Sequence, residues 1–125
     1  MGFPSPAQDY IEASLSLDEL CISHKSATFF MRAGESSVRH GIYKGAVLVV
    51  DRSITPVDGT IIVVEMDGGF RLRRYKTYPA RGLEQLDYPG RLERFDEEEG
   101  IVCFGVVTYV LNDMRTGEFD DNPVI

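Results

Sequence analysis

Two adjacent serines, Ser36 and Ser37, follow Gly34 and Glu35 in a short polar stretch between apolar segments. A serine in a glycine-containing turn can present its hydroxyl to a cleft, as a nucleophile must. Turns also favour serine and glycine for conformational reasons alone, so the stretch by itself favours an ordinary turn over a catalytic one. The residues indicate a candidate nucleophile without establishing one.

A serine nucleophile also needs a base, and the chain has two histidines, His24 and His40. Neither lies in a recognisable triad pattern. His24 falls at the end of a predicted helix, where a solvated or C-capping role is favoured. His40 falls in the turn just after the serines, where a structural role is again favoured. An active hydrolase in which Ser36 or Ser37 uses another base is the competing class of function.

One dense basic stretch covers residues 70–76 and contains three arginines. Alternation along a strand places Arg71, Arg73 and Tyr75 on one face. Such a face can bind single-stranded nucleic acid, with the tyrosine as a stacking platform. The acidic balance of the chain favours the other interpretation, which is a solvated strand whose arginines pair with carboxylates.

Composition limits the class of protein. The 125 residues predict one domain, and 20 acidic against 13 basic residues give a net charge of -7. Such a surface repels phosphate backbones, which disfavours non-specific DNA or RNA binding as the main activity, and we expect no direct, sequence-specific nucleic-acid contact. Cys21 and Cys103 form no CxxC pair, and the acidic run at 96–99 lacks the ligand spacing of a calcium loop, so we expect no metal and no cofactor.

No apolar run long enough for a bilayer and no signal peptide is recognisable, which predicts no membrane contact and a cytoplasmic protein.

The elements that position these residues are expected to be mainly strands. Residues 16–19 match a capping box and predict a short helix that ends near Lys25. Asp67 and Gly68 are typical of a tight hairpin. Apolar and aromatic runs predict strands at 27–31, 46–50, 60–64, 70–76 and 101–111, the last bent at Gly105, with at most a short strand near Leu83. We expect an extended arm at 1–13, one β domain at 14–111 and a polar tail at 112–125.

Segments along most of the chain resemble the UmuD-like branch of the LexA/peptidase S24 family. In chain order they are residues 2–10, 17–20, 26–30, 41–42, 48–51, 54–55, 67–70 and 104–107. No single segment would suffice, but their order makes the match specific, and it ends near Leu111. The resemblance implies a LexA/UmuD C-terminal-like fold: a mainly β, twisted barrel or sheet with one short N-terminal helix and an extended N-terminal arm.

Members of this family use a Ser-Lys dyad. The serine lies in a Ser-Gly-Asp-Ser-Met turn, and the lysine lies on the strand after an Asp-Gly hairpin. The resemblance places the serine at Ser36, in a turn one residue shorter, with Glu35 for Asp and Ser37 for Met. It places Arg73 at the lysine position. A guanidinium stays protonated in proteins, so Arg73 cannot take a proton from Ser36. Lys76 lies three residues further on and is expected to face the other way.

The resemblance also implies partners. The processed form in this family is a homodimer that serves an error-prone, Y-family polymerase of the DNA polymerase V type in SOS mutagenesis, together with the RecA filament. We therefore expect a non-cleaving, UmuD′-like accessory subunit that binds a UmuC-like polymerase, with host UmuD as a further candidate partner. Self-cleaving members carry an arm upstream of the segment matched here by residues 2–6, so we expect a chain made in the processed form, as a phage or plasmid would carry it. The alternative is an active S24-type serine peptidase in which Ser36 uses a non-standard base.

Overall fold

The structure is a computed structural model, and it describes residues 16–96, 98 and 100–115. The predicted arm at 1–13 and residues 116–125 of the predicted tail lie outside the described residues. The described part of the chain forms a seven-stranded sheet in which each neighbouring pair is antiparallel. The predicted mainly β fold with a short N-terminal helix is confirmed. No helix within the described ranges is long and apolar enough to cross a membrane.

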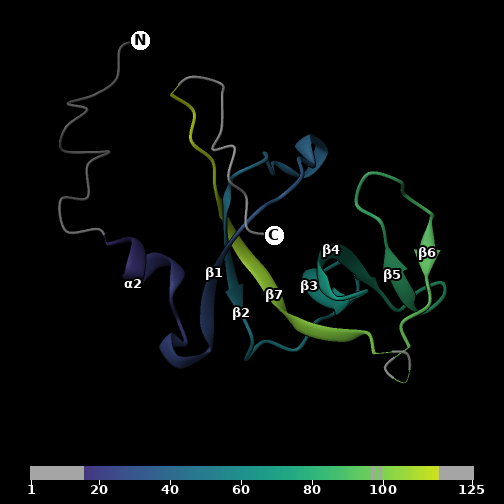
Figure 1. The fold of residues 1–125 in the computed structure, drawn as a ribbon. Helices are drawn as coiled ribbons and strands as arrows, with labels where there is room; N and C mark the ends of the chain where they lie inside the picture. Colours follow the sequence, from purple (N-terminus) through teal and green to yellow (C-terminus); the bar gives the residue numbers. More distant parts are fainter. Residues whose placement is uncertain (1–15, 97, 99, 116–125) are drawn as a thin grey trace, which may run out of the picture.

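The elements follow one another in a simple order. Helix α2 is Leu17–Cys21, and the two 3₁₀ turns are η1 (Lys25–Ala27) and η2 (Val38–His40). The strands are β1 (Thr28–Arg32), β2 (Val47–Asp51), β3 (Ile61–Met66), β4 (Gly69–Lys76), β5 (Gly82–Glu84), β6 (Leu92–Glu93) and β7 (Val102–Leu111). Their order across the sheet is β1-β2-β7-β3-β4-β5-β6. Figure 1 shows β7 as the long curved strand between the β1–β2 half and the β3–β6 half.

The centre of the sheet is formed by the two β-branched runs in β2 and β3, whose side chains are buried on both faces. Successive side chains of a strand point to opposite faces. In β3, Val63 belongs to a first core cluster with Leu48, whereas Ile62 and Val64 belong to a second cluster with Leu83. Strand β3 therefore separates two apolar cores.

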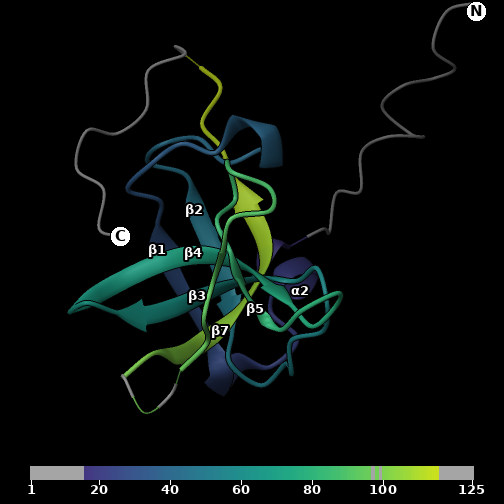
Figure 2. The same cartoon turned by 90° about the vertical axis from the view of Figure 1, so that its right-hand side faces the viewer.

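Two irregularities in register twist the sheet. One lies between Val49 and Val50 in the β2–β7 pair, and the other between Val63 and Val64 in the β3–β7 pair. The second faces the residues around Gly105, where a bend was predicted. An extra residue in one strand of a pair increases the local twist. Figure 2 shows the result, with β3 and β4 running across the direction of β1 and β2.

The predicted β-hairpin is confirmed. Asp67 (φ 51°) and Gly68 (φ 75°) form the two-residue turn between β3 and β4, in the left-handed conformation that glycine adopts without strain. Strand β5 forms around Leu83 as expected. Strand β6 was not predicted, because two residues carry no detectable alternation.

The N-terminal helix is shorter than predicted. Ser16 accepts a hydrogen bond from the N–H of Asp18 at 3.2 Å, as the capping box requires. The helix nevertheless ends at Cys21 and not near Lys25, because Ile22 is already extended (φ -111°, ψ 95°).

His24 was predicted to be solvated or to cap this helix, and it does not cap it. The side chain is exposed, as the solvated role predicts, and its Nδ1 lies 2.8 Å from Oδ2 of Asp51, at the end of β2. Asp51 is buried and also accepts hydrogen bonds from the hydroxyl and N–H of Ser53. The Ser53 hydroxyl, followed by His24, lowers the pKa of the Asp51 carboxyl. This cluster attaches the segment after α2 to the sheet.

Candidate functional site

The two serines lie in the connection between β1 and β2. We call residues 33–37 of this connection the serine turn. A backbone hydrogen bond fixes the start of this turn: the N–H of Gly45 donates to the carbonyl of Ala33 at 2.8 Å. Further out, Ser37 and Ile42 form an isolated antiparallel bridge. Backbone pairing at both points fixes the position of the serines relative to the sheet.

Asn112 binds the part of this connection that leads back to β2. Its side-chain amide donates to the carbonyl of Gly41 at 2.8 Å, and its Oδ1 accepts from the N–H of Tyr43 at 3.1 Å. Gly41 (φ 73°) ends η2 in the left-handed conformation, where a Cβ would add strain. The residue at which the polar tail was predicted to begin is thus part of the support of the serine turn.

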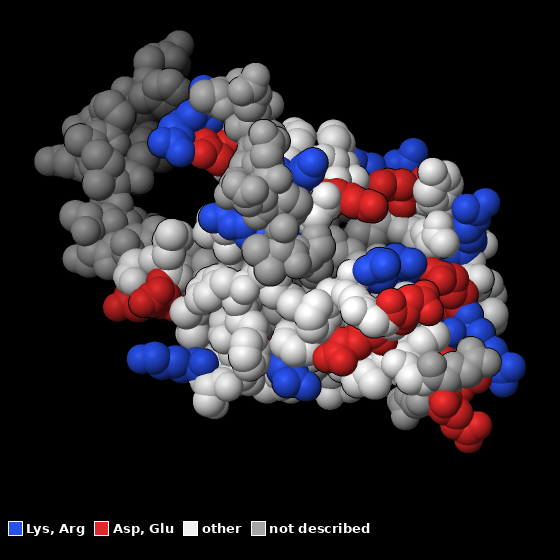
Figure 3. Space-filling view, in the orientation of Figure 1, with Lys and Arg blue, Asp and Glu red and all other residues white. Residues whose placement is uncertain are grey.

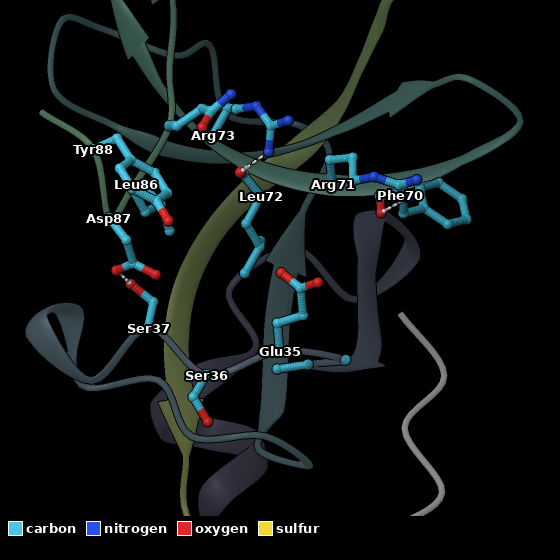
Figure 4. Close-up of a pocket in the computed structure, with 13 residues that line it drawn as sticks. Glu35, Ser36, Ser37, Phe70, Arg71, Leu72, Arg73, Leu86, Asp87 and Tyr88 are labelled. Atoms are coloured by element: carbon cyan, nitrogen blue, oxygen red, sulfur yellow. Dashed lines mark hydrogen bonds between the residues drawn. The ribbon is translucent and has the colours of Figure 1, made fainter. Parts of the chain in front are cut away.

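A cleft of about 550 Å³ opens beside the serine turn. Its lining comes from three segments: the serine turn, residues 70–73 at the start of β4, and residues 85–88 after β5. Both residues carried over from the family, Ser36 and Arg73, line this cleft (Figure 4). The fold therefore brings the two predicted site residues to one place, and their assignment as dyad positions stays a prediction.

Ser36 is exposed, but its hydroxyl is not directed at Arg73. Its Oγ accepts a hydrogen bond from the backbone N–H of Lys44 at 2.9 Å. Figure 4 shows this oxygen pointing away from Arg73. An activated serine needs a proton acceptor at roughly 2.6–3.2 Å. Among the described residues, the hydrogen-bond partner of this hydroxyl is a donor, which cannot serve as its base.

Arg73 is held from another direction. Its Nε donates to Oε1 of Glu93 at 2.5 Å, and a terminal nitrogen donates to the carbonyl of Leu72 at 2.8 Å. The side chains of Arg73 and Glu93 are 17% and 30% exposed. The guanidinium is protonated and already paired, so it cannot receive the proton of a nucleophile.

Ser37, unlike its neighbour, is buried and doubly bonded. Its hydroxyl donates to Oδ1 of Asp87 at 2.8 Å, and its Oγ lies 2.9 Å from Nδ1 of His40. The hydroxyl has one proton, which the carboxylate receives, so Nδ1–H of His40 must donate to the serine oxygen. Burial, followed by the positive charge of Arg74, lowers the pKa of His40.

This cluster does not have the order of a catalytic triad. In a triad the carboxylate orients the histidine, and the histidine receives the serine proton. Here the Ser37 hydroxyl donates its hydrogen bond to Asp87, so His40 is not positioned as its base. The arrangement instead joins the serine turn to residues 85–88 across the cleft.

Three of the four cations of β4 pair with carboxylates, as the favoured interpretation predicts, although most of the strand is half-buried and Arg71 donates to the carbonyl of Phe70. Besides the Arg73 pair, Nε of Arg74 lies 3.7 Å from Oε1 of Glu84, and Nζ of Lys76 lies 3.5 Å from Oδ2 of Asp58. Tyr75 is no free stacking platform, since it packs edge-on against Phe95 in the second core cluster. Figure 3 shows acidic and basic side chains next to one another on the right-hand part of this face.

Three residues of the site were missed in the sequence: Asp87, Glu93 and Asn112. Each lies in a connection or at a strand end, and their partners are 50, 20 and 71 residues away, respectively. The density of cations at 70–76 in an acidic chain does predict carboxylate partners. It cannot name them, because the pairing depends on the register of β4, β5 and β6.

A model of the Peptidase S24-like family matches residues 1–84. The chain belongs to this family. Protein ImpA of Salmonella typhimurium is 45% identical over 116 residues, which is 91% of this chain and 79% of ImpA. Protein SamA of Salmonella typhimurium (strain LT2) is 40% identical over 116 residues, which is 92% of this chain and 81% of SamA. Protein MucA of Escherichia coli is 40% identical over 112 residues, which is 88% of this chain and 77% of MucA. These relatives are UmuD-like proteins, so the resemblance drawn from the sequence is confirmed.

The contrast between the two serines gives a test of this S24-like site. Ser37→Ala is expected to lower the free energy of unfolding by about 1–2 kcal/mol, because Asp87 and His40 lose a part-buried partner. Ser36→Ala, at an exposed position, is expected to change it by less than about 0.5 kcal/mol. Urea denaturation of both variants measures the difference. Equal losses would contradict the structural role of Ser37.

Proposed function

We propose that this S24-like protein acts by binding and not by cleavage, as an accessory subunit of an error-prone, Y-family DNA polymerase in SOS mutagenesis. Its similarity to UmuD-like proteins supports the SOS mutagenesis setting. The observation that carries the non-cleaving part is the Arg73–Glu93 pair. Where the family supplies a lysine base, this chain holds a guanidinium that stays protonated.

The partners that follow are protein partners. They are a second copy of the chain in a homodimer, a UmuC-like polymerase subunit, the RecA filament and host UmuD. Strand β1 supports contacts of this kind, because it lies at one edge of the sheet and its Phe29 and Phe30 are 41% and 57% exposed. Sheet edges and exposed aromatic side chains are features through which protein surfaces associate. The net charge of -7 fits a subunit that leaves contact with DNA to its partners.

The competing activity is a peptidase in which Ser36 uses a non-standard base. It needs a proton acceptor at the Ser36 hydroxyl, and the structure gives that hydroxyl the N–H of Lys44. His40, the histidine nearest in sequence, is bonded to Ser37. The geometry therefore favours the binding function over this alternative.

The test is capture of a UmuC-like, Y-family polymerase subunit by the tagged full chain. We expect stoichiometric recovery of the subunit, equal for the wild type and for Ser36→Ala, and no labelling of Ser36 by a fluorophosphonate probe. Failure of capture by folded, dimeric protein would contradict the accessory role. Labelling that disappears in Ser36→Ala would instead establish the peptidase.

A further inference from the structure

Glu93 reaches Arg73 from two strands away. Strand β6 pairs with β5 through Leu83 and Glu93, and β5 pairs with β4 through Tyr75 and Leu83. Residues directly opposite one another across a sheet share a face, so Tyr75, Leu83 and Glu93 point the same way. Arg73 lies two residues before Tyr75 and shares that face. The register of three strands thus brings the carboxylate to the arginine.

The pair lies in a partly shielded place. Its side chains are 17% and 30% exposed, and β5 and β6 approach so closely that a Cβ on Gly82 would lie 2.8 Å from the carbonyl of Glu93. Opposite charges that are partly withdrawn from water attract one another more strongly than a fully solvated pair. The carboxylate therefore favours a charged side chain at position 73.

We propose that Glu93 is a second determinant, besides Arg73 itself, that keeps this cleft without a general base. A lysine that serves as a base must be neutral, which requires a lowered pKa. A carboxylate at ion-pair distance acts in the opposite direction. Glu93 is not among the residues that line the cleft and acts through position 73, so it is a positioning residue. The inference rests on the proposed non-cleaving function and adds its electrostatic cause.

The proposal predicts that restoring a lysine is not enough to restore a base. In Arg73→Lys, the pKa of the introduced lysine is expected to lie at or above its ordinary value of about 10.4. In Arg73→Lys/Glu93→Gln, burial acts on the introduced lysine without the opposing charge of the carboxylate. We expect the pKa of this lysine to be lower than in Arg73→Lys by about one unit or more. Titration of lysines labelled with ¹³C at the ε carbon, followed by NMR, measures both values.

A matched control removes a different carboxylate. Glu84 lies 3.7 Å from Arg74, and Arg73→Lys/Glu84→Gln is expected to leave the titration of the introduced lysine unchanged. Equal pKa values in Arg73→Lys and Arg73→Lys/Glu93→Gln, or an equal drop in the Glu84→Gln control, would overturn the proposal. Arg73→Lys/Glu93→Ala carries the same test if the glutamine variant does not fold.

The titration is independent of the polymerase. We expect these variants to capture the polymerase subunit as well as the wild type does. Failed capture by the wild type, together with a shifted lysine pKa in the variants, would therefore count against the accessory function and leave the role of Glu93 intact. An unshifted lysine pKa together with normal capture would overturn the role of Glu93 and leave the accessory function intact.

Discussion

Replacing Gly105 with alanine is expected to destabilise the protein by about 2–3 kcal/mol, because the new methyl group has no space. Its Cβ would lie 2.8 Å from Cγ1 of Val50, 3.2 Å from the carbonyl of Asp51 and 3.3 Å from Cγ of Arg52. Val50 is fully buried and β-branched, so it cannot turn aside without clashing with other core side chains. Strand β7 must then separate from β2. Urea denaturation, monitored by circular dichroism, measures the loss.

The matched control is Gly69→Ala. At this position the Cβ would lie 2.9 Å from a terminal nitrogen of Arg71, which is the far end of a flexible side chain. Arg71 is exposed and can move, so we expect a change of less than about 1 kcal/mol. Similar losses at Gly105 and Gly69 would show that the β2–β7 contact is not the constraint.

Replacing Leu83 with alanine is expected to cost about 2–5 kcal/mol, since it leaves a cavity at a fully buried position. Leu83 is the residue of β5 that packs in the second core cluster, together with Ile62 and Val64. It also pairs in register with Glu93, so the same change loosens the strand that carries the partner of Arg73. Denaturation gives the stability, and hydrogen exchange gives its location.

Hydrogen exchange is expected to rise in β5 and β6 of Leu83→Ala and to change little in β2. Leu92→Ala is the control, because Leu92 lies on β6 but is 39% exposed. Its truncation is expected to cost less than about 1 kcal/mol and to leave the exchange pattern unchanged. Exchange that rises equally in β2 would mean that the two core clusters do not respond separately.

The parts of the fold that sequence predicted are those encoded by neighbouring residues. The β-branched runs became β2 and β3, because their side chains are suited to a sheet covered on both faces. The turn at Asp67 and Gly68 was predicted because its backbone angles demand those residue types. The predicted end of α2 was wrong by about one turn, since the chain is already extended at Ile22 and His24 then binds Asp51 of β2.

The parts of the site that sequence did not predict depend on register. The resemblance predicted Ser36 and Arg73 as one site, and both line one cleft. The directions of their side chains are set by Lys44 and Glu93, which no local pattern identifies as partners. The hydrogen bonds of Asp87 likewise join loops that are distant in sequence, so they follow only once the strands are aligned.

The separation of the two core clusters by β3 has a consequence for how this protein can evolve. The serine turn rests on the first cluster through Ala33 and Ile42, whereas the face that carries Arg73 and Glu93 rests on the second through Leu83. Substitutions in the second cluster can change the setting of the Arg73–Glu93 pair, while the serine turn and the cleft residues Phe70, Leu72 and Leu86 keep the first cluster beneath them. A lineage can therefore change the charges around position 73 by drift and still inherit the serine turn and the exposed sheet edge at β1.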